Sequence, residues 1–543
     1  MGFCLKIIVL FSLVVCALLI PHASCFAATS IPFTVTMSEA VNITGSPRLV
    51  LDVDGTTRYA PYTSGSGSSS LTFTYDATIG DIDLDGIGIA STSLDLNGGT
   101  VTDLNGNAMS NLTFTAPANM ASVKVNYPSL SMNFVYDSDG RYTLNGTAYN
   151  DLTSLLTAAG GSFTRASTAT YYNSSGVLSI AASGAPRFDY DPSTLVFKGL
   201  LIEENSSNKL QYSDDFSNAL WQKINVTVST DVTTSPDGAA NADKAVSAAT
   251  TGSFFVLQDS AVVSGVTYTQ SFYVKAAGWN YVQLGSSTGF DTTSTWVNFN
   301  LSTGTIGNHG TGGTYGIQAI NNGWYRIYLT ATSTATSAAG RFYLALMPTD
   351  INGRNPPSAT GDGTSGVYVY GGQFESYQIP TTYIPTASSN VTRNAETLII
   401  PTGTWYNQNA GTFMNNISWL THNGSNSPMF FRVDDTTNNN RWNLFYNQAN
   451  TRLQIGALTA AASQGGGIHT PYALSGSATV SGAQSLNNTN GAFDGSISSL
   501  DTGWLPPPVT RLNIYGNDAT KWNKELRYYP VRASDTQLQL LTQ

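Results

Sequence analysis

The chain contains one short motif that is typical of serine hydrolases. Gly285-Ser-Ser-Thr-Gly289 matches the G-x-S-x-G elbow, whose serine sits at a turn from a strand into a helix. The preceding residues, 281–284, offer a strand, but residues 290–296 are not typical of a helix. A serine nucleophile also needs an imidazole base, and His309, His422 and His469 all lie in Gly- or Asn-rich loops. We therefore expect the match to be accidental.

Acidic residues are the second possible source of chemistry, because glycoside hydrolysis commonly uses a pair of carboxylates. Glutamate is scarce, and Glu203, Glu204 and Glu375 fall in segments that resemble strands. We expect these three residues to be structural. The sequence thus predicts that the protein is not an enzyme, with a polysaccharide-degrading enzyme as the less favoured alternative.

Three aspartates form the best candidate for a metal site. Asp81, Asp83 and Asp85 alternate in a turn that ends at Gly86, like the start of a calcium loop. The twelfth position of an EF-hand loop needs an acidic residue, but Thr92 stands there. Alternating carboxylates in an extended turn can still share a hard cation. We predict a structural calcium ion at these residues, with a polar turn as the alternative, and no other cofactor.

Aromatic residues are the candidates for ligand binding. Tyr and Trp combine a large apolar area with a polar group, which suits the apolar faces and hydroxyl edges of sugar rings. Several lie among Asn, Thr, Ser and Gly, as an exposed sugar site requires. The predicted binding residues are Trp279, Tyr281, Trp296, Tyr368 and Tyr370. The alternative is that these rings pack in a core.

The composition predicts which elements position these residues. Only 11% of the 543 residues are charged and 11% are aromatic. The scarcity of Lys and Glu disfavours helices, whereas Thr, Tyr, Val and Trp favour strands. The formal charge is −10, with 24 basic and 34 acidic residues, and this argues against nucleic acid as a partner. The length suggests about three or four domains.

The first 28 residues have the layout of a secretory signal peptide. Lys6 precedes an apolar run from Ile7 to Ile20, and small residues follow up to Ala28. We predict cleavage near Ala27-Ala28 and a secreted or cell-surface protein. Lipoprotein anchoring at Cys25 is disfavoured because His22 stands where a lipoprotein box has Leu. No later stretch is long and apolar enough for a transmembrane span.

Residues 29–126 alternate between short strands and turns. Phe33 to Met37, Leu49 to Val53 and Leu71 to Tyr75 have the period of two that is typical of strands. The ordered features Ser38-Glu39-Ala40-Val41, Leu96-Asn-Gly-Gly99 and Asp103-Leu-Asn-Gly-Asn107 resemble bacterial immunoglobulin-like repeats. That resemblance implies a spacer or stalk.

Residues 127–208 carry a different succession of motifs. Phe163-Thr-Arg-Ala-Ser-Thr-Ala-Thr-Tyr171, Pro186-Arg-Phe-Asp-Tyr190 and Gly199-Leu-Leu-Ile-Glu-Glu204 follow in order. Together they resemble a segment of phage tail-fibre and head-spike proteins. This segment is short and rich in turns, so we expect it to complete the C-terminal domain.

Two further domains are expected after this segment. In residues 209–378, strand-like runs such as Tyr268 to Lys275 and Gly323 to Leu329 resemble jelly-roll carbohydrate-binding modules. Residues 379–543 end with Leu526-Arg-Tyr-Tyr-Pro-Val-Arg532 and a predicted short helix, Asp535 to Leu541. They resemble concanavalin A-like or laminin G-like lectin domains. The predicted fold class is all-β, with several β-sandwiches (immunoglobulin-like, jelly roll and concanavalin A-like) in tandem. Insertion of the jelly roll in the lectin-like domain is the alternative arrangement.

These resemblances imply a non-enzymatic adhesin or lectin-like protein that binds glycans or cell-surface polysaccharide. Avidity would come from repeated copies, so a homo-oligomer is left open. A structural surface-layer or filament subunit is the alternative. The resemblances concern folds, and a fold hosts many functions, so the site has to decide between these classes.

Overall fold

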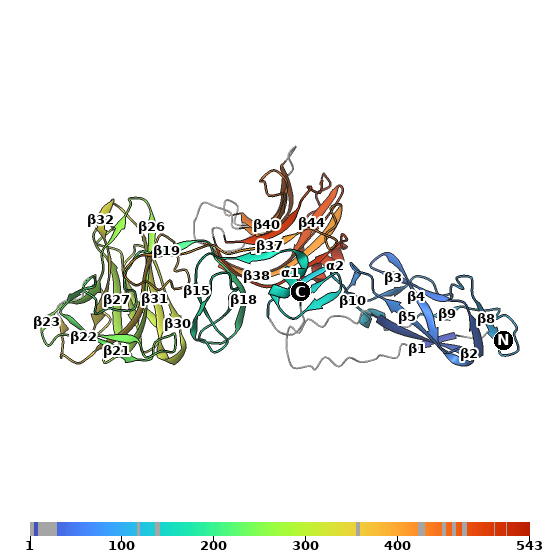
Figure 1. Cartoon of the computed structure of the whole chain (residues 1–543), viewed down its shortest axis with the longest axis horizontal. Coiled ribbons are helices and arrows are strands. Elements are labelled where there is room, and N and C mark those ends of the chain that lie inside the picture. The colour runs from blue at the N-terminus through green and yellow to red at the C-terminus, as the bar shows by residue number, and fades with distance from the viewer. Residues whose placement is uncertain are drawn as a thin grey trace.

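The computed structural model of the chain describes residues 5–8, 30–116, 120–135, 142–354, 359–421, 429–447, 452–458, 463–469, 475–503, 505–516 and 519–543. Strands make up about 53% and helices about 4% of the structure, and the strand pairing is antiparallel except for one pair of named strands. The prediction of an all-β fold with several sandwiches is therefore confirmed. Three bodies lie in a row along the long axis of the molecule (Figure 1).

The N-terminal unit lies at one end of this row. Its main sheet contains β1 (Leu5–Ile8), β2 (Ser30–Thr44), β3 (Arg48–Val53), β4 (Thr56–Ser64), β5 (Ser68–Asp76), β7 (Gly88–Ile89), β8 (Thr100–Asp103) and β9 (Phe114–Thr115). A small pair joins β6 (Ile82–Asp83) to β10 (Val125–Asn126), next to a 3-10 turn at Met120–Ser122. Alternate residues of β2, such as Phe33 and Val35, are buried, which confirms the predicted strand period. Apart from β1, the predicted signal peptide lies outside the described residues.

The C-terminal sandwich lies in the centre of the molecule and consists of two sheets. The ten-stranded sheet contains β11 (Leu130–Asn133), β12 (Tyr142–Leu144), β13 (Thr147–Tyr149), β17 (Phe188–Tyr190), β18 (Phe197–Ile202), β38 (Ala410–Thr421), β43 (Ser475–Ser485), β44 (Asn488–Phe493), β45 (Ser496–Ile497) and β47 (Ala519–Tyr529). The seven-stranded sheet contains β14 (Ser162–Thr164), β37 (Thr397–Pro401), β39 (Met429–Asp434), β40 (Arg441–Asn447), β41 (Arg452–Leu458), β42 (Ser463–His469) and β46 (Arg511–Tyr515). One hydrophobic core joins them.

Strand β47 joins sequence segments that lie far apart. On one side it pairs with β38, and on the other it pairs with both β11 and β18, as in the match of Leu201 to Trp522. Leu130, Met132, Leu200 and Ile202 belong to the same core as Phe413 and Leu526. Early strands and late strands thus share one sheet and one core.

The inserted sandwich lies at the other end of the row. Its first sheet contains β20 (Gln222–Ile224), β24 (Phe254–Leu257), β27 (Tyr281–Ser286), β28 (Trp296–Asn300), β29 (Thr305–His309) and β33 (Phe342–Met347). Its second sheet contains β21 (Val226–Thr233), β22 (Ala242–Ser247), β26 (Thr267–Ala277), β30 (Thr314–Ala319), β31 (Tyr325–Thr332) and β35 (Gly366–Glu375). Short pairs join β23 (Thr251–Gly252) to β34 (Ala359–Thr360) and β25 (Ser260–Val262) to β32 (Ser337–Gly340), and a 3-10 turn spans Asn321–Gly323.

Two short pairs and two helices complete the described structure. The pairs are β15 (Ala169–Tyr172) with β16 (Leu178–Ala181) and β19 (Ser206–Asn208) with β36 (Val391–Arg393). Helix α1 (Leu152–Ala159) begins with Asp151 as its N-cap, and α2 (Asp535–Leu540) begins with Ser534 as its N-cap. The predicted C-terminal helix is confirmed. None of the helices in the described ranges is long and apolar enough to cross a membrane.

Candidate functional site

A groove of about 680 Å³ opens where the second sheet of the inserted sandwich meets the C-terminal sandwich. Threonine hydroxyls line much of it, from Thr267, Thr295, Thr314, Thr330 and Thr332. The other lining residues are Asp291, Gly312, Gly313, Tyr328, Ala331, Gln378, Ile379 and Leu420. Leu420 belongs to β38, so the wall combines residues from two sandwiches.

The strand period explains why this groove is polar. Along β31, Ile327 and Leu329 belong to the apolar core, so Tyr328 and Thr330 face the opposite side of the sheet. Thr330 pairs with Thr314 on β30 and with Thr269 on β26. Polar residues therefore lie side by side across three strands. The groove is the part of this polar face that other segments leave uncovered.

Tyr328 is the aromatic residue of the groove. It is half-buried, and its direct partner across the strand pair is Gly316. A Cβ atom at residue 316 would lie 2.5 Å from the Tyr328 ring, so the ring occupies the space of the missing side chain. Glycine inside a strand often marks such a close approach. Burial raises the pKa of the Tyr328 phenol, so the group stays protonated at neutral pH.

Two polar groups in the groove have unused hydrogen-bonding capacity. Within the described ranges, the structure forms no hydrogen bond to the Tyr328 hydroxyl or to the Gln378 side-chain amide. Half-buried polar groups normally bond to protein or water. These two residues therefore offer donors and acceptors to a bound molecule.

The loop that carries Gln378 is held firmly at both ends. The Glu375 carboxylate accepts hydrogen bonds from Thr381 N at 2.9 Å and from Thr381 Oγ1 at 2.7 Å. Between them, the Tyr377 carbonyl accepts from Thr269 Oγ1 on β26 at 2.7 Å. Both Glu375 and Thr381 are almost fully buried. Gln378 and Ile379 therefore project from a closed, anchored loop.

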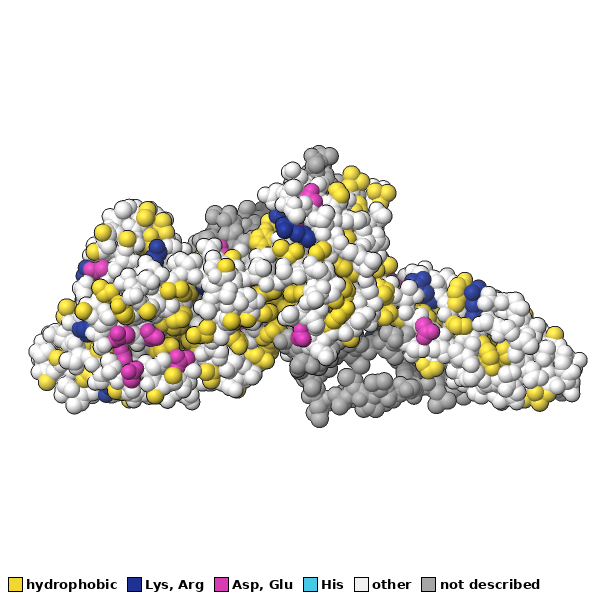
Figure 2. Space-filling view, in the orientation of Figure 1, with side chains coloured by type: hydrophobic (Ala, Val, Ile, Leu, Met, Phe, Trp, Pro, Cys, Tyr) yellow, Lys and Arg dark blue, Asp and Glu magenta, His cyan; other side chains and the backbone are white. Residues whose placement is uncertain are grey.

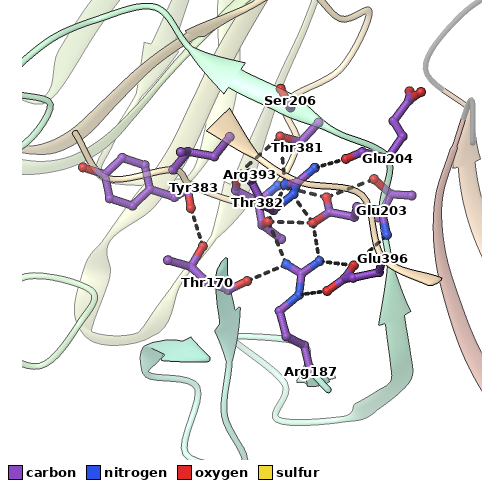
Figure 3. A network of polar contacts seen from close by, with 12 residues as sticks. Thr170, Arg187, Glu203, Glu204, Ser206, Thr381, Thr382, Tyr383, Arg393 and Glu396 are labelled. Carbon is purple, nitrogen blue, oxygen red and sulfur yellow. Dashed lines mark hydrogen bonds and ion pairs between the residues drawn. The ribbon is translucent and has the colours of Figure 1, made fainter. Parts of the chain in front are cut away.

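A buried ionic network lies beside this loop, at the place where the chain enters and leaves the inserted sandwich (Figure 3). Arg187 Nη2 lies 2.9 Å from Glu203 Oε2 and 2.6 Å from Glu396 Oε2. Arg393 Nη1 also lies 2.9 Å from Glu203 Oε2, and Arg165 Nη1 lies 2.7 Å from Glu396 Oε1. These side chains are at most 1% exposed.

The charged partners of Glu203 keep its carboxylate ionised. Burial by itself would raise the pKa of Glu203, but Arg393 and Arg187 and the hydrogen bonds from Thr382 lower it below its ordinary value. A general acid would need a raised pKa and access to substrate. Glu203 and Glu375 are both buried, and they accept hydrogen bonds from Thr382 and Ser206 respectively, so neither carboxylate is open to a ligand in this structure. Their structural role stays a prediction.

The five predicted sugar-binding aromatics do not form an exposed platform. Trp279, Trp296 and Tyr370 are less than 10% exposed, and Trp279 packs edge-on against Phe254 in the core. Tyr281 is half-buried and its hydroxyl accepts a hydrogen bond from Asn300 Nδ2. The three buried rings leave no face on which a sugar could stack.

Tyr368 and Tyr370 lie on β35, away from the groove lining. The Tyr370 hydroxyl donates to Asp237 Oδ2 at 2.9 Å, and Tyr368 is half-buried against the small core around Trp324. The alternative of core packing thus describes Trp279, Trp296 and Tyr370. The sequence around these three residues contained no signal that distinguished the buried face of each strand from the exposed face.

The aspartates of the predicted calcium turn face separate partners. Asp81 Oδ1 lies 2.6 Å from Arg58 Nη2, and Asp83 accepts from the amides of Asp54 and Gly86. Asp85 accepts from Gln537 Nε2 on α2 at 2.6 Å, so this turn docks the N-terminal unit onto the C-terminal sandwich. No group of three His, Cys, Asp or Glu side chains suited to a metal ion occurs in the part of the chain that the structure describes. Calcium binding at this turn stays a prediction.

The hydrolase-like motif has no elbow geometry. Gly285 lies on β27, and the segment from Ser287 to Thr295 is a turn that leads directly into β28 rather than a helix. His309 lies on β29 with its ring 4.7 Å from that of Tyr315. His422 lies outside the described residues. The interpretation of the motif as accidental agrees with this geometry.

Comparisons with known proteins add little to this geometry. No family model and no curated protein matches the chain. Among solved structures, Trypanosoma rangeli sialidase in complex with sialic acid is 10% identical with a TM-score of 0.22, over 56% of this chain and 60% of the sialidase. The same sialidase with the inhibitor DANA is 8% identical with a TM-score of 0.23, over 95% and 92% of the two chains.

A GH43 protein, the BlXynB mutant from Bacillus licheniformis, is 9% identical with a TM-score of 0.19, over 57% of this chain and 75% of that protein. Scores this low transfer neither a fold nor an activity to the chain. The function has to be argued from the groove itself.

The function predicted from the sequence requires a correction. The prediction of a non-enzymatic adhesin or lectin-like protein is wrong, because it depends on exposed aromatic rings and the structure buries Trp279, Trp296 and Tyr370. The prediction that the protein is not an enzyme has no positive support.

The groove residues Tyr328, Gln378 and Asp291 were not predicted from the sequence. A signal for Tyr328 was present, because Trp324-Tyr-Arg-Ile-Tyr-Leu329 alternates and places Tyr328 opposite Ile327 and Leu329. No comparable signal existed for Gln378, whose position depends on the anchored loop.

Proposed function

We propose that this chain is a carbohydrate-active protein that takes a segment of a glycan into the groove beside Tyr328. The observation that carries the proposal is a groove lined by threonines in which the Tyr328 hydroxyl and the Gln378 amide have unused hydrogen-bonding capacity. Its volume of about 680 Å³ falls within the range of small-molecule sites, roughly 300–1,000 Å³.

The groove suits sugars better than other ligands. The Tyr328 ring supplies an apolar area next to a polar group, and threonine hydroxyls can both donate to and accept from sugar hydroxyls. Its lining contains no Lys or Arg, so it lacks the cations that nucleic acids require. A lipid chain would bury polar groups without partners, which is costly.

Asp291 is the single carboxylate among the lining residues. Glycoside hydrolysis by the usual route needs two carboxylates that flank the bond. The groove therefore supplies one of these carboxylates together with polar groups for recognition of the glycan, and the assay below measures binding and cleavage in the same samples.

Glycan binding and cleavage can be tested together on the full chain. Binding of a glycan panel is measured by calorimetry, and reducing ends are measured in the same samples. We expect Tyr328→Ala to weaken the best ligand about tenfold, because truncating an aromatic contact costs roughly 1 kcal/mol or more. The matched control is Tyr59→Ala, since Tyr59 is 43% exposed on the N-terminal unit and stacks on Arg48. The proposal fails if no glycan binds saturably, or if Tyr328→Ala binds as tightly as the parent.

A further inference from the structure

The distribution of charge in the groove is one-sided. Asp291 is its single ionisable carboxylate, and no Lys, Arg or His is among the lining residues. The surface seen in Figure 2 also carries few basic side chains, and the chain has a formal charge of −10. An anionic ligand would therefore meet negative charge without a cation to offset it.

The negative charge of Asp291 is fixed by its turn. Its Oδ1 accepts hydrogen bonds from Thr293 N at 2.8 Å and Thr293 Oγ1 at 2.7 Å, and its Oδ2 accepts from Ser294 Oγ. These donors hold the pKa of Asp291 well below its ordinary value, so the group is ionised at any working pH. The residue remains half-exposed, and a carboxylate has about four acceptor sites, so capacity remains for a ligand.

We infer that the groove takes uncharged glycan chains and rejects chains that carry carboxylate, sulfate or phosphate groups, with Asp291 as the residue that discriminates. This inference rests on the proposed function. A sugar hydroxyl can donate a hydrogen bond to the Asp291 carboxylate, whereas an ionised uronate has no proton to donate there. Two like charges at close range also repel each other.

Matched pairs of ligands test the inference. The probes are oligosaccharides of glucose, mannose and galactose, each compared with the same oligosaccharide oxidised at C6 to the uronate. We expect the full chain to bind at least one neutral oligosaccharide about tenfold more tightly than its uronate partner at low ionic strength. Added salt should reduce this difference in affinity, because it screens the charges of Asp291 and the uronate.

Two variants then assign the discrimination to one residue. Asp291→Asn should reduce the difference in affinity between the neutral oligosaccharide and its uronate to about twofold. The reason is that the amide keeps an acceptor for Thr293 N but carries no charge. Asp362→Asn is the matched control, because Asp362 accepts from Thr364 and Ser365 in a similar exposed turn outside the groove. This control should leave the difference in affinity unchanged.

Three other results of these binding experiments would contradict the inference or the proposed function. Equal or tighter binding of the uronate overturns the inference while the proposed function stands. An unchanged difference in affinity in Asp291→Asn overturns the role of Asp291. If neither member of any pair binds, the proposed function fails and the inference fails with it.

Discussion

Single residues in this protein are often held in states that their type alone would not predict. Asp243 on β22 is an example, because it is only 2% exposed and accepts hydrogen bonds from Phe216 N at 2.9 Å and Asp231 N at 3.1 Å. Burial, together with the nearby carboxylates of Asp215 and Asp231, raises its pKa to about 6 despite these bonds. Between pH 3.8 and about pH 6, the native state thus holds a proton that the unfolded chain releases.

This proton sets a pH dependence with a definite sign. Between the unfolded value of 3.8 and the folded value of about 6, the native state binds more protons, so stability falls as pH rises. The contribution is fully present below the lower value and is lost as pH rises through the upper one. Between pH 5 and pH 8 it amounts to roughly 1 to 1.5 kcal/mol.

Denaturant unfolding of the full chain at pH 5 and pH 8 measures this effect. We expect Asp243→Asn to reduce the stability difference between the two pH values by that amount. Asp362→Asn is the control, since donors lower the pKa of Asp362 and its contribution does not change in this range. An undiminished pH dependence in Asp243→Asn would show that other groups cause it.

At the scale of elements, the ionic network of Figure 3 connects strands that lie far apart in the sequence. Glu396 lies between β36 and β37, Arg187 precedes β17, and Glu203 follows β18. Glu396 also accepts from Glu203 N at 2.9 Å, so one carboxylate ties together two arginines and a backbone amide. Removing one member leaves buried charges without partners.

We therefore expect Glu396→Gln to destabilise the C-terminal sandwich by about 3–5 kcal/mol, the usual cost of breaking a buried ion pair. The matched control is Glu39→Gln on the exposed side of β2, which should change stability by less than about 0.5 kcal/mol. Both values come from denaturant titrations at neutral pH. A change in Glu396→Gln as small as in the control would mean that the network contributes no net stability.

At the scale of the whole molecule, the inserted sandwich interrupts the C-terminal sandwich without disturbing its sheet. Ser206 to Asn208 pair with Val391 to Arg393, and Asn208 Nδ2 donates to Ile384 O at 2.9 Å. The two ends of the insertion thus lie side by side. This arrangement suggests that the inserted part can be removed as a unit.

Two shortened chains test whether the C-terminal sandwich needs the early strands β11 and β18 in order to fold. A chain in which a short Gly-Ser linker replaces residues 209–380 should unfold cooperatively, because it keeps β11, β18, β47 and the ionic network. Residues 379–543 alone should not, because β47 loses two neighbours and the core loses Leu130, Met132, Leu200 and Ile202. Thermal circular dichroism checks both, and cooperative folding of residues 379–543 alone would contradict this view of the fold.

Local sequence patterns were sufficient to predict the fold class, many of the strands and the C-terminal helix, but helix α1 (Leu152–Ala159) was not predicted. Alternation in segments such as Phe33 to Met37 and Trp296 to Asn300 predicts strands that the structure contains, because the period of a strand is a property of its own backbone. The short C-terminal helix follows from its local sequence for the same reason.

The candidate site could not be predicted in this way, because it depends on which surfaces other segments cover. Trp296 and Tyr328 both lie on strands with polar neighbours, yet Trp296 is buried while Tyr328 lines the groove. The groove combines β31, the anchored loop at Gln378 and Leu420 of β38, three segments that meet only after the sandwiches dock. Local backbone geometry determines the strands, but long-range packing decides which side chains remain open to a ligand.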